Sequence, residues 1–124
     1  MLKSKLLSPD PRLNACEVND PSHVKLGDRG DFVGRIQQAL IRIENAPIDD
    51  TELAERVYGK TTAGAVLAYK KKRNIVNRAY QTQADDIVGK LTIRSLDDEL
   101  LKFEAESSDE FFAGALRPIS GRLV

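Results

Sequence analysis

One cysteine and one histidine are the residues with which this chain would perform nucleophilic chemistry, and they stand at Cys16 and His23. A thiol nucleophile needs a base within about 2.6–3.2 Å and a third group that orients the base. Both residues lie in a proline-bounded stretch that supplies no orienting group and no oxyanion site. One Cys and one His also cannot form the multi-residue cluster that zinc requires. We therefore predict a noncatalytic protein without a metal or cofactor.

Two other patterns suggest chemistry at first sight. Acids are paired at 49–50, 85–86 and 97–98, but adjacent side chains diverge on a helix or strand, which is poor geometry for acid–base partners. Gly59-Lys60-Thr61 matches the end of a phosphate-binding loop. That motif also needs a glycine where this chain has Ala54, and a strand before it where we predict a helix. Neither pattern is predicted to be a catalytic or phosphate site.

The composition restricts the class of partner. The chain has 124 residues, 41% of them hydrophobic, with 19 basic and 19 acidic side chains and a net charge of zero. This length suits one domain. Without a positive charge there is no long-range attraction to phosphate, so we predict no nucleic-acid partner and favour a neutral ligand. The first residues are too short an apolar stretch for a signal peptide, and no run reaches membrane-spanning length. We expect synthesis in the cytoplasm and no membrane span.

The elements follow from hydrophobic spacing, and the fold class that we predict is all-α. An irregular N-terminal arm (1–23) precedes a compact three-helix domain (24–103), and an irregular C-terminal arm (104–124) follows it. The glycines and the acid at Gly27, Gly30 and Asp31 indicate a helix entry, so the first helix is predicted over 31–44. Its buried residues recur at steps of three and four: Val33, Ile36, Leu40 and Ile43.

Two further helices complete the predicted domain. A short helix at 51–57 leads to the second main helix, which is capped by Thr61 or Thr62 and ends in the basic run 70–73 before Asn74. We interpret that run as favourable positive charge at a helix C-terminus. The third main helix is predicted to begin at the cap Thr92. The residues predicted to be buried are Ala63, Val66, Leu67 and Tyr69 in the second helix and Ile93, Leu96, Leu100 and Phe103 in the third.

An internal repeat is the most specific feature. The sequence VYGKTT at 57–62 and the sequence IVGKLT at 87–92 each place an apolar pair before Gly-Lys-x-Thr, and each leads into a helix. The apolar residue anchors the approach, Gly59 or Gly89 permits a tight turn, and Thr62 or Thr92 caps the helix. The spacing of 30 residues is typical of a duplicated supersecondary unit.

These motifs together resemble a known family. The segments LGDRGDFV (26–33), IQQAL (36–40), VYGKTTAGAVLAY (57–69) and DIVGKLTIRSL (86–96) resemble the peptidoglycan-binding domain family in order, spacing and residue type. The resemblance covers residues 24 to about 101. The sequence departs from the family in the longer stretches 45–57 and 75–86, and in having Asp86-Ile87 where Asp-Gly is common.

The resemblance implies a compact three-helix module without catalysis, which binds the glycan or stem peptide of peptidoglycan at the bacterial envelope or in the periplasm. Ligands of that kind bind aromatic faces and fixed donors and acceptors. Tyr58 is equally consistent with an apolar anchor, and Tyr69 is predicted to lie in the core. The candidate ligand-binding residues are Tyr58, Thr62, Arg73, Tyr80, Gln81 and Asp86.

The alternative function is a protein-interaction module on the same scaffold, an accessory of a secretion apparatus, phage particle or toxin system. Its motivation is the pair of arms, the missing export signal and the lengthened loops. Phe111 and Phe112 in the C-terminal arm would form an apolar patch, which either docks on the domain itself or binds a protein partner.

Overall fold

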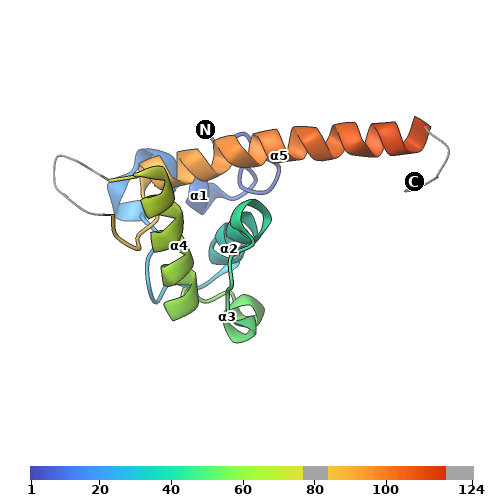
Figure 1. Ribbon diagram of the computed structural model, residues 1–124. Helices are drawn as coiled ribbons and strands as arrows, with labels where there is room; N and C mark the ends of the chain where they lie inside the picture. The colour runs from blue at the N-terminus through green and yellow to red at the C-terminus, as the bar shows by residue number, and fades with distance from the viewer. Residues whose placement is uncertain (77–83, 117–124) are drawn as a thin grey trace.

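The structure is a computed structural model that describes residues 1–76 and 84–116, with the backbone alone described for residue 20 and residues 106–116. Five α-helices are present in this part of the chain, so the all-α prediction is confirmed. The long helix α5 crosses the other helices in Figure 1, with α1 against it and α2, α3 and α4 to one side. The helices are α1 (Pro11–Val18), α2 (Asp31–Glu44), α3 (Asp50–Glu55), α4 (Lys60–Arg73) and α5 (Lys90–Leu116).

The three main helices form one core. Helix α5 packs against α1 and α2, and α2 packs against α4. The apolar stripe of α2 is buried as predicted, apart from Ile43, which is partly buried. Tyr69 of α4 is also in the core, as its spacing predicted, whereas Leu67 is only half-buried. The bounds predicted for α2 are confirmed, and α4 ends as expected, with Asn74 in the left-handed conformation as its C-cap.

The prediction of an irregular N-terminal arm was wrong for residues 11–18. Asp10 caps α1 by accepting hydrogen bonds from the backbone N–H groups of Arg12 and Leu13, and Pro11 occupies the first helical turn. Proline is favoured there because that N–H has no partner within the helix. Leu7, Leu13 and other residues of this segment are fully buried in the core, so the segment is part of the domain.

The third main helix is longer than predicted. Helix α5 continues through Leu116, into the stretch expected to be an irregular arm. Phe103 was predicted to be buried but is 41% exposed. At 3.6 residues per turn, Phe103 lies about 80° away from Ile93 around the helix, whereas Glu104 lies within about 20° of it. The buried stripe therefore passes through Glu104. The side chains of Phe111 and Phe112 lie outside the described residues.

Candidate functional site

The two Gly-Lys turns come together on one short segment of chain. Val24 pairs with Val88 of the second turn through backbone hydrogen bonds of 3.0 and 2.8 Å. The same segment then reaches the first turn. The N–H of Tyr58 donates to the Asp28 carbonyl at 2.8 Å, and the Tyr58 carbonyl accepts from the N–H of Gly27 at 2.9 Å. Residues 24–30 therefore lie against both turns. We call this junction of residues 24–30, 57–59 and 85–89 the turn junction.

Positive backbone φ angles occur where the helix-entry pattern predicted them. Gly27 has a φ of +96° and Gly30 a φ of +141°, and this conformation is strained for residues with a side chain. The next residue, Asp31, begins α2 and accepts a hydrogen bond of 2.9 Å from Arg35. These three motif residues thus have the structural role expected of them.

The first turn is held by a carboxylate that the sequence did not reveal. Glu52 of α3 accepts hydrogen bonds from the backbone N–H groups of Gly59 (3.1 Å), Thr61 (2.9 Å) and Thr62 (2.9 Å), and from the Thr62 hydroxyl (2.7 Å). Burial alone would raise the pKa of Glu52, but hydrogen bonds from Thr61 and Thr62 outweigh burial and hold the pKa at about 2. A charged carboxylate therefore caps α4.

The predicted threonine caps were wrong. Gly59 occupies the N-cap position of α4 and makes no side-chain capping bond, and Thr62 lies inside the first turn. Helix α5 likewise begins at Lys90, so Thr92 is inside it. Gly59 is needed for close approach, because a Cβ atom there would lie 2.6 Å from the Glu52 carboxyl carbon. Gln37 completes the support by donating to the Thr62 hydroxyl at 3.0 Å and the Val57 carbonyl at 3.0 Å.

The second turn is held by different groups. Lys70 of α4 donates to the Asp85 carboxylate at 2.5 Å and to the Ile87 carbonyl at 2.7 Å. At Gly89 the neighbour is the ring of His23, whose Nε2 would lie 3.1 Å from an added Cβ atom. A helix begins at the lysine in both copies of the repeat, whereas the side chains that support the two turns differ.

Tyr58 links the two turns. Its side chain is fully buried, and its hydroxyl group donates a hydrogen bond to the Asp86 carbonyl. Burial raises the pKa of Tyr58 well above its usual range, and so do the nearby negative charges of Asp86, Asp85 and Asp28. This hydroxyl stays protonated, and three carboxylates lie around it. The ring is an anchor of the turn, which is the second of the two roles that the sequence left open.

Arg73 joins three helices. Its guanidinium group stacks on the Tyr69 ring at 3.8 Å and forms ion pairs with Glu44 of α2 and Glu99 of α5. The hydrogen bonds that Arg73 donates to Glu99, and then to Glu44, raise the pKa of Arg73 although burial opposes them. Lys72 also pairs with Glu44, at 3.0 Å. The basic run thus forms ion pairs between helices as well as favourable charge at the end of α4.

The six predicted ligand residues have different positions. Tyr58 and Thr62 are fully buried, and Arg73 is about one-fifth exposed and paired with acids. Asp86 is half-buried, and its carboxylate makes no hydrogen bond or ion pair with the residues that the structure describes. Tyr80 and Gln81 lie outside the described residues. Asp86 is therefore the candidate whose side chain remains available at the turn junction.

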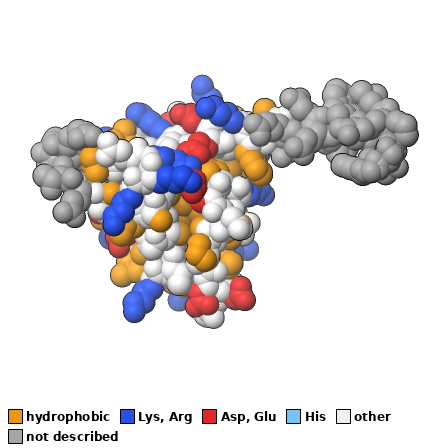
Figure 2. Space-filling view, viewed as in Figure 1, with side chains coloured by type: hydrophobic (Ala, Val, Ile, Leu, Met, Phe, Trp, Pro, Cys, Tyr) orange, Lys and Arg blue, Asp and Glu red, His pale blue; other side chains and the backbone are white. Residues whose placement is uncertain are grey.

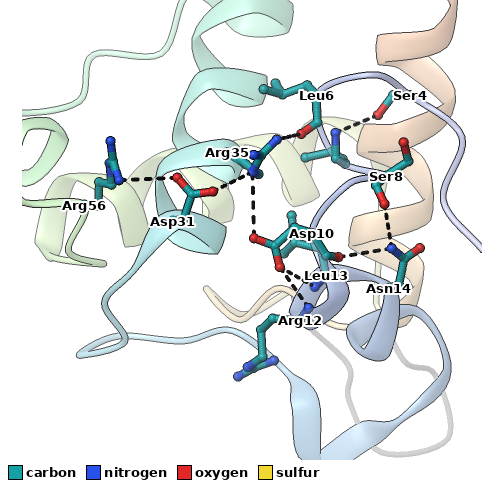
Figure 3. Close-up of polar contacts among 11 residues, drawn as sticks. Ser4, Leu6, Ser8, Asp10, Arg12, Leu13, Asn14, Asp31, Arg35 and Arg56 are labelled. Atoms are coloured by element: carbon teal, nitrogen blue, oxygen red, sulfur yellow. Dashed lines mark hydrogen bonds and ion pairs between the residues drawn. The ribbon is translucent and has the colours of Figure 1, made fainter.

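The N-terminal segment is hydrogen-bonded to α2 and α5. In Figure 3, Arg35 of α2 points toward Asp31, Asp10 and the Leu6 carbonyl, to which it donates at 2.7 Å. Asp97 of α5 accepts hydrogen bonds from the backbone N–H groups of Lys3 and Ser4 at 2.9 and 2.8 Å. These contacts are structural, and no local pattern predicts them, because Arg35 lies 29 positions from Leu6 and Asp97 lies 94 and 93 positions from Lys3 and Ser4.

Cys16 is a buried core residue. Its thiol contacts the Val88 carbonyl at 3.4 Å, and burial raises its pKa to about 11 although the charge of Arg12 opposes the shift. A thiol with this pKa is protonated at neutral pH and is a poor nucleophile. Among the residues described, no group of His, Cys, Asp and Glu side chains is arranged to hold a metal ion.

Comparisons with known proteins identify no relative. A scan against protein-family models found no match, and neither a search of curated proteins nor a search of solved structures found one. No helix in the described ranges is both long and apolar enough to cross a membrane. Figure 2 shows acidic and basic side chains close together on the face drawn, without a large area of one charge.

Proposed function

We propose that this chain is a noncatalytic peptidoglycan-binding module that acts at the bacterial envelope, with the glycan or the stem peptide as its ligand. The turn junction carries this proposal. The three motifs on which the family resemblance rests, residues 26–40, 57–69 and 86–96, are far apart in the sequence, yet they meet in one place through the pairing of residues 24–30 with both turns. A ligand at this junction contacts all three motifs at once.

The chemistry of the turn junction suits an uncharged polar ligand. Asp86 offers a carboxylate acceptor beside the backbone of the second turn, and sugar hydroxyls and peptide N–H groups are donors to such an acceptor. Hydrogen bonds to a charged group contribute about 1.5–3 kcal/mol each. The zero net charge of the chain agrees with a ligand that needs no long-range electrostatic attraction.

Sedimentation with purified cell-wall sacculi tests the proposal. We expect the protein to pellet with sacculi and Asp86→Asn to pellet less, by about tenfold in affinity if one charge-assisted hydrogen bond is lost. Asp98→Asn on the exposed face of α5 is the matched control and should bind as the wild type does. Protein that stays in the supernatant with a helical circular dichroism spectrum would contradict the proposal.

The second candidate function is a protein-interaction module of a secretion apparatus, phage particle or toxin system. One observation favours it: α5 extends beyond the rest of the fold in Figure 1, and its last 12 residues, after Glu104, span about 18 Å. A pull-down from native lysate, with the full chain and with a chain lacking residues 105–124, tests it. A partner recovered equally by both forms, or by neither, would count against a role for this extension.

A further inference from the structure

Lys70 carries a buried charge that stability does not explain. Its side chain is 7% exposed, and its ammonium group bonds the Asp85 carboxylate and the Ile87 carbonyl. Removing the Lys70 charge from water costs several kcal/mol, although the Asp85 side chain keeps about one-third of its surface exposed, and replacing such a pair by apolar residues of similar size is often neutral or stabilising. A role other than stability is therefore expected for this pair.

Lys70 and Tyr58 together form hydrogen bonds with three consecutive residues, 85–87. Lys70 holds the Asp85 side chain and the Ile87 carbonyl, and the Tyr58 hydroxyl holds the Asp86 carbonyl between them. The Asp85 carboxylate also accepts from the N–H of Ile87 at 3.1 Å. The backbone on both sides of the Asp86 side chain is thus fixed by groups from α4 and the first turn.

We propose that Lys70 is a positioning residue for ligand binding at the turn junction. Its ammonium group fixes residues 85–87 so that the Asp86 carboxylate is presented to the ligand in one orientation. This inference rests on the proposed function. It adds that the orientation of Asp86 depends on a residue that makes no ligand contact itself. In some proteins a buried ion pair specifies one conformation while adding little net stability.

The double variant Lys70→Met/Asp85→Leu separates positioning from stability. Two apolar side chains replace the buried pair, so we expect the free energy of unfolding to stay close to that of the wild type. The backbone amide of Val88, which donates to the Val24 carbonyl, should nevertheless exchange hydrogen about tenfold faster, because local opening of this segment no longer breaks the ion pair. The amide of Ile87 should exchange faster for a separate reason, because Asp85→Leu removes its acceptor. The affinity for sacculi should fall by about tenfold, the order of loss seen when a group that orients a binding residue is removed.

Two single variants keep the test interpretable. Lys71→Met removes the same charge from the neighbouring exposed position, and it should change neither exchange at residues 87 and 88 nor binding. Lys70→Met alone leaves Asp85 about one-third exposed and so still solvated, which provides a second folded variant with the same expected loss. Unchanged exchange in the double variant would overturn the proposal, and so would unchanged binding by that variant when the wild type binds sacculi.

The two readouts also separate this proposal from the proposed function. If the wild type does not bind sacculi, the proposed function fails, but faster exchange at Val88 in the folded double variant still supports the positioning role of Lys70. Unchanged exchange in that variant overturns the positioning role whatever the wild type binds.

Discussion

The first and second Gly-Lys turns share one sequence pattern, and a helix begins at the lysine of each, but a different side chain holds each of them. A carboxylate, Glu52, caps the helix that follows the first turn. An ammonium group, Lys70, holds the chain that enters the second turn. The first support fixes the start of a helix, and the second fixes the residues before one.

This difference explains what the repeat encodes. Gly-Lys-x-Thr specifies where a helix begins. The side chains that support each copy come from the part of the fold nearest to it. The first turn is close-packed under α3, with Gly59 directly against Glu52. The second turn lies beside Asp86, whose carboxylate has no bond to the described residues. We infer that the first turn is the structural copy and that the second is the copy available for binding.

Among changes at the two turns, removal of the Glu52 carboxylate should lower the free energy of unfolding the most. Glu52→Ala leaves three backbone N–H groups at the start of α4 without their acceptor, and we expect a loss of about 3 kcal/mol in the free energy of unfolding. Urea unfolding measures it. Glu55→Ala, on the same short helix but 53% exposed, should change stability by no more than about 0.5 kcal/mol. Equal losses in the two variants would mean that Glu52 is not the cap we describe.

The contribution of Glu52 should depend on pH in one direction. The pKa of this carboxyl is about 2 in the folded chain against an ordinary value of 4.5, so its stabilisation is present above pH 4.5 and is lost as the pH falls toward 2. The difference in unfolding free energy between the wild type and Glu52→Ala should therefore shrink over this range. The Glu44 and Glu99 carboxyls, whose pKa values Arg73 also lowers, titrate in both proteins. A difference that is constant down to pH 2 would contradict the assignment.

The two turn glycines should tolerate alanine to different degrees. Gly59→Ala forces a Cβ atom to within 2.6 Å of Glu52 and should cost about 2 kcal/mol, whereas Gly89→Ala meets the ring of His23 at 3.1 Å and should cost about 1 kcal/mol or less. Thermal unfolding compares them. In a Glu52→Ala background the cost of Gly59→Ala should nearly vanish, because the clash is with that side chain. A cost that persists there would assign the constraint to the backbone instead.

The smallest expected difference in stability is between variants of Thr62 and Thr92, the threonines that follow the two turns. The Thr62 hydroxyl bonds both Glu52 and Gln37, so Thr62→Val should cost about 1 kcal/mol. Thr92 is equally buried, but its hydroxyl makes no hydrogen bond with the residues described, so Thr92→Val should stay within about 0.5 kcal/mol of the wild type. Chemical denaturation of both variants is the measurement. A larger loss at Thr92 would show that the second turn has a polar network of its own.

Local sequence patterns predicted most of the helices, but they did not predict the side chains that support the turns through long-range contacts. The stripe of α2 follows from the spacing of Val33, Ile36 and Leu40 alone, and Asn74 marks the end of α4. Helix α1 also has a local signal, Asp10 followed by Pro11, which the neighbouring Pro9 and Pro21 obscured. Glu52 and Lys70 have no such signal, because their partners lie 7 to 17 positions away and are brought near only by folding.

Titration of the isotope-labelled protein with soluble peptidoglycan fragments, followed by amide chemical shifts, tests the central claim most directly. We predict saturable shifts at the turn junction, residues 24–30, 57–59 and 85–89, and unchanged shifts in α3. Fragments that leave the turn junction unchanged at high concentration, while the spectrum remains that of a folded protein, would contradict the account.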